Sequence, residues 1–299
     1  MAQYLGRHTC LSHLFAAGAH AEIPLLRTGA PPWILATGDR RRVERIRARL
    51  SDPLDLRAFA RERLGELAGA RVDLALGRHR GLPVLAVETQ MGGPATEIIL
   101  REVLDPSFHP RGARAVIRVG TCGTVHAGPE ETPPLAIAEF AAGYSAAIEQ
   151  ARHGVLAPPS DSVPARAADG SAARGPSPPR LPCSPAVTAA LVAAVARVAP
   201  GTPFLTGGCF SKDSLYAEQD RRFATILTEL GCVATEMELS TIGPVAESLG
   251  VLWGGIMATA GRVPDGPWLD PETIRAHEEL AIDVALAALA HLAASTPTS

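Results

Sequence analysis

Lysine and asparagine are almost missing from this chain of 299 residues. Lys212 is its only lysine, and asparagine does not occur. The 28 basic residues are therefore nearly all arginine, and with 31 acidic residues they leave a net charge of −3. So small an imbalance argues against a nucleic acid or an anionic membrane held by bulk electrostatics. We attribute the many arginines and alanines to a GC-rich genome, so arginine number alone says little about function.

Paired cysteines and long apolar runs are also missing. The five cysteines are odd in number and contain no Cys-x-x-Cys pair, which argues against a disulfide framework or a zinc site. The most apolar stretch, residues 281–294, is too short to span a membrane and carries Asp283 and His291. The N-terminus lacks the pattern of a secretory signal. We therefore expect a soluble cytoplasmic protein with reduced thiols and no metal.

The chain does have a regular alternation between short apolar runs, typical of strands, and segments whose apolar residues recur at helical spacing. With 46% apolar residues it can build a core of ordinary size. Nearly all-apolar strands between helices are typical of a sheet covered on both faces, so we expect one three-layer α/β/α domain with a mixed central sheet. Predicted strands are 33–37, 72–76, 83–88, 115–119, 134–138, 204–208 and 251–258; predicted helices are 41–50, 95–104, 185–198, 220–230, 239–249 and 271–293.

Two segments do not fit this alternation. Residues up to about 30 show no sustained periodicity and are interpreted as an arm, with 1–19 as an extension and 20–299 as the domain. Residues 157–184 are dense in Pro, Ser, Ala and Gly, a composition that cannot bury enough apolar surface to offset its ordering entropy. We expect a mobile insertion there.

Two arginine-containing segments could bind an anion. The turn GDRRRV, which starts at Gly38, places free backbone N–H groups at a helix start, where Arg42 could add a guanidinium. An ordinary strand-to-helix turn is the plainer interpretation. In RVGTCG, Arg118 lies inside an otherwise apolar strand and needs a partner. That partner could equally be a ligand or a structural carboxylate.

Three further segments carry polar residues at predicted strand ends. In MGGPAT the two glycines permit close backbone approach, or simply begin a helix. In EMELS, Glu236 and Glu238 could accept hydrogen bonds from sugar hydroxyls, or act as first-turn charges that favour the helix dipole. In KDSLYAEQDR, Gln219 and Arg221 could bind the edge of an imide such as uracil, or be solvated.

Taken together and in this order, the five segments resemble the nucleoside phosphorylase family, and within it the uridine phosphorylase branch. The resemblance covers roughly residues 20–293 apart from the insertion, and the Gln219 and Arg221 pair is the part that favours a pyrimidine. The chain departs from the family pattern at Arg40, where the turn usually has proline, and at Leu215, where an aromatic residue usually stacks on the base.

The resemblance implies a role for each matching residue. Phosphate would be held by Gly38, Arg42, Arg118 and Thr121, with Arg61 supplied by a neighbouring subunit. The nucleoside would be bound by His20 (from the partner's arm), Cys122, Gly123, Leu215, Gln219, Arg221, Glu236, Met237 and Glu238. Arg221, Arg118 and Glu238 would be the catalytic residues. The resemblance further implies a homo-oligomer, a dimer-based hexamer with shared sites, and inorganic phosphate as co-substrate without any other cofactor.

The implied reaction is phosphorolysis of uridine, or of a uridine altered at the 5′ position, to uracil and a ribose 1-phosphate. Arg221 would lie where negative charge accumulates on the departing base. Purine enzymes of the family use an aspartate after the strand that follows the EME helix, and residues 258–262 contain no acid. Two alternatives stay open: a nucleosidase that uses water, and a noncatalytic nucleoside-binding homologue.

Overall fold

The computed structural model describes residues 8–69, 71–125, 132–143, 178–216, 221–264, 266 and 268–295, and at residues 67, 69 and 221 the backbone alone. Most of the predicted insertion, residues 157–177, lies outside this range, as does Gln219. The last residues of that segment are described and form a short strand, β7 (Arg180–Pro182), paired with β6. Leu181 in β7 and Cys183 after it are buried, so the sheet already resumes before residue 184.

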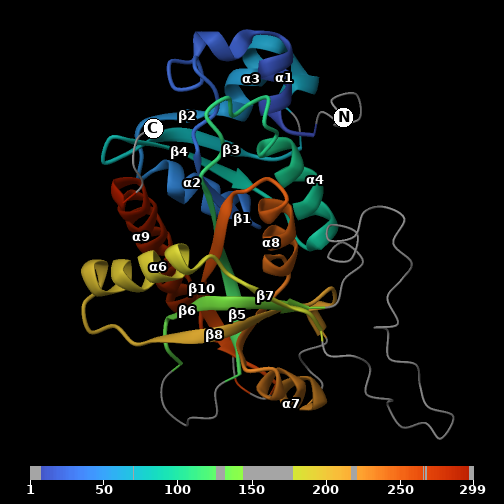
Figure 1. Ribbon diagram of the computed structural model, residues 1–299, viewed down its shortest axis with the longest axis vertical. Coiled ribbons are helices and arrows are strands. Elements are labelled where there is room, and N and C mark those ends of the chain that lie inside the picture. Colours follow the sequence, from blue (N-terminus) through green and yellow to red (C-terminus); the bar gives the residue numbers. More distant parts are fainter. Residues whose placement is uncertain are drawn as a thin grey trace, which may run out of the picture.

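Ten strands of the described chain form one mixed sheet, in the order β10-β6-β8-β9-β5-β1-β4-β3-β2, with β7 beside β6. Because β10 also pairs with β5, the strands β5, β10, β6, β8 and β9 close into a ring, and β1, β4, β3 and β2 extend from it (Figure 1). The strands other than β7 are β1 (Trp33–Thr37), β2 (Ser51–Asp55), β3 (Leu74–His79), β4 (Leu82–Glu88), β5 (Ala115–Thr124), β6 (Leu135–Gly143), β8 (Phe204–Ser211), β9 (Cys232–Glu236) and β10 (Leu252–Arg262).

Helices cover both faces of this sheet. They are α1 (Cys10–Ala16), α2 (Arg40–Arg47), α3 (Leu56–Leu64), α4 (Gly93–Val103), α6 (Pro185–Val198), α7 (Arg221–Glu229), α8 (Leu239–Glu247) and α9 (Pro271–Ser295), with short 3-10 turns at η1 (Ala19–Glu22) and η2 (Glu66–Gly69). Successive residues of β1 alternate between two cores. Ile34 joins the core beneath α1, α3, α4 and α8, and Leu35 joins the core beneath α2, α6 and α9. The predicted three-layer α/β/α fold is thus confirmed.

The element predictions hold for the long segments and fail for short or charged ones. Strand 33–37 and helix 185–198 are found with the predicted bounds. Helix α3 was not predicted because charged residues interrupt the apolar ones in its sequence LRAFARERL, and it buries only Leu56 and Ala60. Strand β9 was not predicted because it has five residues and ends in a charge.

The interpretation of residues up to about 30 as an arm is not what the structure shows. Leu11 and Leu14 of α1 are fully buried, and they pack in the same core as α3 and α4. His8 and Thr9 donate backbone hydrogen bonds to the buried carboxylate of Glu102 in α4. The described part of this segment therefore belongs to the body of the domain. Its helical spacing of apolar residues, from Cys10 to Phe15, covers little more than one turn and is too short to form a sustained period.

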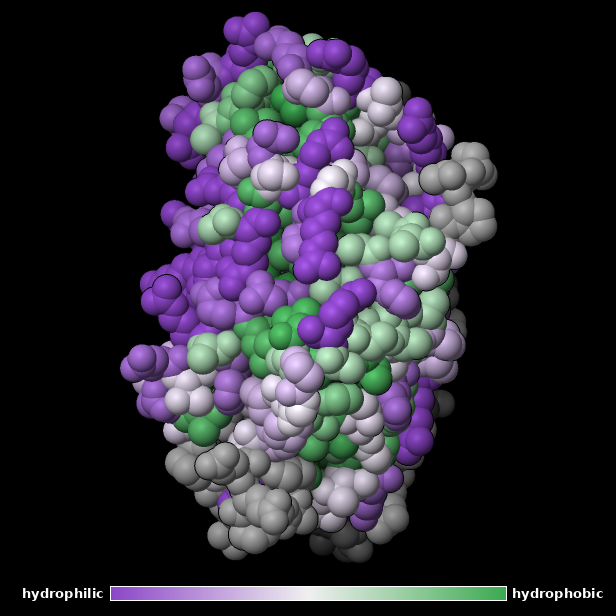
Figure 2. Space-filling model, turned by 90° about the vertical axis from the view of Figure 1, so that its left-hand side faces the viewer, coloured by the Kyte–Doolittle hydropathy of each residue, from purple (hydrophilic) through white to green (hydrophobic). Residues whose placement is uncertain are grey.

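No helix among the described residues is both long and apolar enough to cross a membrane. The longest, α9, differs between its two ends: Glu272 and Arg275 near its start are exposed, whereas Leu286 and Leu289 in its second half are fully buried. Figure 2 views the molecule from the side on which α9 and α6 lie in Figure 1, and hydrophilic and apolar residues are interspersed over that surface.

Candidate active site

A pocket of about 270 Å³ opens where β1, β5, β8 and β9 end and where α2 and α8 begin. Open α/β sheets bind ligands at this edge, because helix N-termini and strand-end loops converge there. Its walls combine cationic, carboxylate and apolar side chains. They are Gly38, Asp39, Arg42, Met91, Arg118, Thr121, Cys122, Gly123, Lys212, Leu215, Thr235, Glu236, Met237, Glu238, Ala260, Trp268 and Glu278.

The turn between β1 and α2 approaches Arg118 closely because it contains a glycine. A Cβ at Gly38 would lie 3.1 Å from the carbonyl oxygen of Gln90 and 3.5 Å from Nη1 of Arg118. The Asp39 side chain accepts a hydrogen bond of 2.8 Å from the backbone N–H of Arg41 and so caps α2. A Cβ at position 38 would thus be tight against the Gln90 carbonyl oxygen and in van der Waals contact with the guanidinium.

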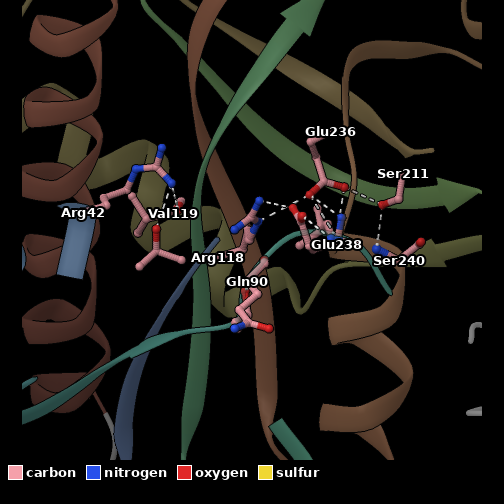
Figure 3. Close-up of polar contacts among 12 residues, drawn as sticks. Arg42, Gln90, Arg118, Val119, Ser211, Glu236, Glu238 and Ser240 are labelled. Carbon is pink, nitrogen blue, oxygen red and sulfur yellow. Dashed lines mark hydrogen bonds and ion pairs between the residues drawn. The ribbon is translucent and has the colours of Figure 1, made fainter. Parts of the chain in front are cut away.

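Arg118 of β5 lies at the centre of the site, 4% exposed, with two carboxylates on one side (Figure 3). Its Nε donates to Oε2 of Glu236 at 3.3 Å, and its Nη2 donates to Oε2 of Glu238. Gly120 leaves room for this arrangement, since a Cβ there would lie 3.0 Å from the guanidinium carbon. Burial disfavours the charge of Arg118, but Glu238 and Glu236 outweigh burial and raise its pKa above the ordinary value.

The two glutamates at the start of α8 have different surroundings. Glu236 accepts backbone hydrogen bonds from Glu238 (2.8 Å) and Leu239 (2.9 Å), and a further one from the Ser211 hydroxyl, so it anchors the first turn of α8. Glu238 accepts one from the backbone N–H of Gly92 at 2.8 Å. Burial raises the pKa of Glu238, against the opposing charge of Arg118.

Arg42 of α2 enters the pocket from the other side and is held by α9. Its Nη1 donates to the Thr37 hydroxyl at 2.8 Å, and its Nη2 donates to the carboxylate of Glu278, which also pairs with Arg45. Burial lowers the pKa of Arg42, against the opposing charge of Glu278. Burial alone would raise the pKa of Glu278, but Arg42 reverses this and holds it below the ordinary range.

The Arg42–Glu278 pair predicts a pH-dependent contribution to stability. A carboxylate with a lower pKa in the folded state stabilises the protein above its unfolded pKa, and this contribution disappears as pH falls through the folded value. We expect Glu278→Gln to lower the free energy of unfolding by about 3 kcal/mol at pH 7, because it leaves Arg42 buried without its counter-charge. Urea unfolding at pH 7 and below 4.5, the ordinary glutamate pKa, tests this. The loss of unfolding free energy caused by Glu278→Gln should be smaller at the lower pH. An equal loss at both pH values would contradict this contribution of the ion pair.

Two buried guanidinium nitrogens in the pocket have no hydrogen-bond partner among the described residues. They are Nη1 of Arg118, which faces Gly38, and Nε of Arg42. A buried N–H of a charged group is costly to leave unsatisfied. Two such donors beside a glycine turn and a helix N-terminus suit a small multivalent anion.

Most residues that the sequence motifs singled out meet in this pocket. They are Gly38, Arg42, Arg118, Thr121, Cys122, Gly123, Leu215, Glu236, Met237 and Glu238. Arg61 and His20 do not line it. The Arg61 side chain is 46% exposed on α3 and pairs with Glu66 at 3.2 Å, and the His20 ring stacks on Phe15 at 4.1 Å. Arg221 begins α7, and its side chain, like all of Gln219, lies outside the described residues.

The pocket also includes residues that the sequence analysis did not assign to a site. Three of them, Lys212, Met91 and Thr235, lie within or beside the quoted motifs. Their position near strand ends is the sequence feature that could have assigned them to the pocket. Glu278 lies in the first third of α9, and nothing in its sequence surroundings distinguishes it from a solvated charge. Trp268 is 59% exposed, which is unusual for tryptophan, but its exposure is visible only in the structure.

Comparison with known proteins agrees with this geometry. Residues 33–294 match the family model of the phosphorylase superfamily. Similar solved structures include purine nucleoside phosphorylase from Toxoplasma gondii in complex with immucillin-H (18% identity, TM-score 0.66, covering 90% of this chain and 94% of that chain) and uridine phosphorylase from Vibrio fischeri ES114 (18% identity, TM-score 0.64, 87% and 91%). At this identity the two structures show the fold alone. No curated protein sequence matches the chain. The family match over 262 consecutive positions confirms the family expected from the motifs: the chain belongs to the phosphorylase superfamily.

Proposed function

We propose that this chain is a nucleoside phosphorylase that cleaves uridine, or a uridine altered at its 5′ position, with inorganic phosphate. The products are uracil and the corresponding ribose 1-phosphate. The observation that carries the proposal is a pair of buried guanidinium nitrogens that have no hydrogen-bond partner among the residues the structure describes. They are Nη1 of Arg118, beside Gly38, and Nε of Arg42, which lines the same pocket. A nucleosidase has no need of two buried cations where water attacks, so this arrangement supports phosphate.

The arrangement of the pocket suits attack at C1′ of a bound ribose. Arg118 lies between the anion position and Glu238, so one guanidinium orients phosphate and the ribose-binding carboxylate together. Glu238 accepts from the ribose hydroxyls, and Met237 packs on the sugar. As the glycosidic bond breaks, the ribose becomes oxocarbenium-like, and the adjacent carboxylate and phosphate stabilise its positive charge.

A pyrimidine is proposed on two features of the sequence. Gln219 and Arg221 are the donors and acceptors expected at the imide edge of uracil, and Arg221 would face the charge that accumulates on the base. In addition, residues 258–262 of β10, where Ala260 lines the pocket, carry no carboxylate to protonate a purine. Leu215 replaces the usual stacking aromatic residue. We therefore expect the affinity for the base to be low or the selection among bases to be relaxed.

The site is proposed to be shared between subunits of a dimer-based hexamer. Arg61 and His20 do not line the pocket of their own chain, and both lie on the lobe built by α1, η1 and α3. In an oligomer, this lobe would bring Arg61 to the phosphate and His20 to the 5′ position of a partner's nucleoside. The proposed location is the cytoplasm.

The substrate class is tested by incubating the purified protein with uridine, thymidine and inosine in phosphate buffer and following base release by absorbance. We expect release of uracil, and little or no hypoxanthine. Release of hypoxanthine alone would contradict the pyrimidine assignment. Binding of uridine without any release would favour a noncatalytic homologue.

A further inference from the structure

Lys212 follows β8 and lines the pocket, yet none of the roles assigned above uses it. Lys212 is only 6% exposed, although its side chain carries a charge whose burial costs several kcal/mol. Its backbone N–H donates to the carbonyl of Glu236 at 2.9 Å, which ties the residue to the start of α8. All the remaining Lys or Arg positions of the chain are arginine, and its one lysine is buried at the site.

The position of Lys212 along the sheet places it at the base end of the pocket. The proposed anion position lies after β1, beside Gly38, whereas Lys212 follows β8, and β9 and β5 come between. Its Nζ lies 3.4 Å from the hydroxyl of Thr235, and Thr235 pairs directly with Gly123 in β5. In a displacement at C1′, phosphate enters and the base departs on opposite faces. The side of the pocket away from Gly38 is therefore the side that receives the base.

We propose that Lys212 is a catalytic residue, whose ammonium group donates a hydrogen bond to the departing nucleobase. This inference rests on the proposed function. As an oxygen of phosphate bonds to C1′, the electron pair of the C1′–N1 bond stays on N1 and spreads over the carbonyl oxygens of the pyrimidine ring. Lys212 keeps its proton throughout and stabilises this charge, and the released anion takes a proton from solvent.

Lysine suits this task because its ammonium is a compact charge with three donors on a flexible stem, unlike the planar fork of arginine. A preorganised donor facing charge that develops only in the transition state acts on kcat and changes substrate binding little. The burial of Lys212 strengthens the interaction, because water screens it less.

The test compares wild type with Lys212→Met, which keeps an unbranched stem but removes the ammonium group, and Lys212→Arg. Arg197→Met serves as control, because it removes one positive charge from α6 outside the pocket. Steady-state rates are measured on uridine and on 5-fluorouridine, whose base is a better leaving group, and the KM for phosphate and the Tm are measured for each variant.

We expect Lys212→Met to lower kcat on uridine by about 10²–10³-fold, with the KM for phosphate within about twofold of wild type. The loss should be clearly smaller on 5-fluorouridine, because a more acidic base needs less stabilisation. Lys212→Arg should recover part of the rate, and Arg197→Met should match wild type. If Lys212 had a structural role alone, Lys212→Met would lower kcat on both substrates by the same factor.

Equal losses on the two substrates, or an unchanged kcat on uridine in a wild-type enzyme that is active, would overturn the role of Lys212 and leave the proposed function intact. A wild-type protein that releases no base from any nucleoside would overturn both.

Discussion

Arg118→Met is expected to lower the rate of phosphorolysis strongly and to destabilise the protein. The substitution leaves Glu236 and Glu238 buried without their shared cation, and removing one partner of a buried ion pair typically costs about 3–5 kcal/mol of folding stability. It also removes the nitrogen that faces Gly38. If the same interaction holds phosphate, kcat/KM for phosphate should fall by about 10²–10³-fold or more. Urea unfolding and initial rates at varied phosphate measure the two effects.

A second substitution separates binding from folding. Arg118→Lys keeps a cation near the glutamates, but an ammonium cannot span Glu236, Glu238 and an anion together as the guanidinium fork does. We expect it to recover much of the stability and to leave the KM for phosphate raised at least tenfold. Arg101→Met, which removes a partly exposed arginine from α4, is the control and should change neither quantity. A normal KM for phosphate in Arg118→Lys would contradict phosphate binding by this residue.

Glu238→Gln is expected to lower kcat/KM on uridine by about 10- to 100-fold, the cost of replacing a charged acceptor by a neutral one at a hydrogen bond. Glutamine keeps the size of the side chain and can still accept from the N–H of Gly92, so the loop before α4 is preserved. The ratio of kcat/KM for uridine to that for 2′-deoxyuridine should also fall, because the carboxylate accepts from the ribose hydroxyls. Initial rates on the two nucleosides measure this.

The same variant has a pH signature. Burial raises the pKa of Glu238 above the ordinary 4.5, and the ionised carboxylate accepts hydrogen bonds from hydroxyls more strongly than the protonated form does. Activity of the wild type should therefore fall on the acid side at a pH above the ordinary glutamate range, and Glu238→Gln should lose this limb. Glu44→Gln, on the exposed face of α2, should keep it. An acid limb that persists in Glu238→Gln would assign the titration to another group.

The sequence indicates which residues meet in one pocket where short motifs place polar residues at the ends of apolar strands. The turn at Gly38, the lone arginine of β5 and the two glutamates before α8 each stand out against apolar strands, and strand ends at one edge of a sheet must meet. Ten of the residues named from these motifs and from the family resemblance line one pocket.

What could not be predicted depends on contacts between distant segments. Glu278 reaches Arg42 across 236 positions, and only the packing of α9 against the sheet brings the two together. The role of α1 was missed for a similar reason. Its apolar residues repeat over little more than one turn, and their burial depends on α3 and α4. Local pattern carries no information about such pairings.

The measurement that tests the account most directly is uridine cleavage with and without inorganic phosphate, with the sugar product identified by phosphorus NMR. The buried guanidinium nitrogens of Arg42 and Arg118 predict uracil release that requires phosphate and yields ribose 1-phosphate in equal amount. Uracil release at the same rate without phosphate, with free ribose as the product, would contradict phosphorolysis and identify the enzyme as a hydrolase.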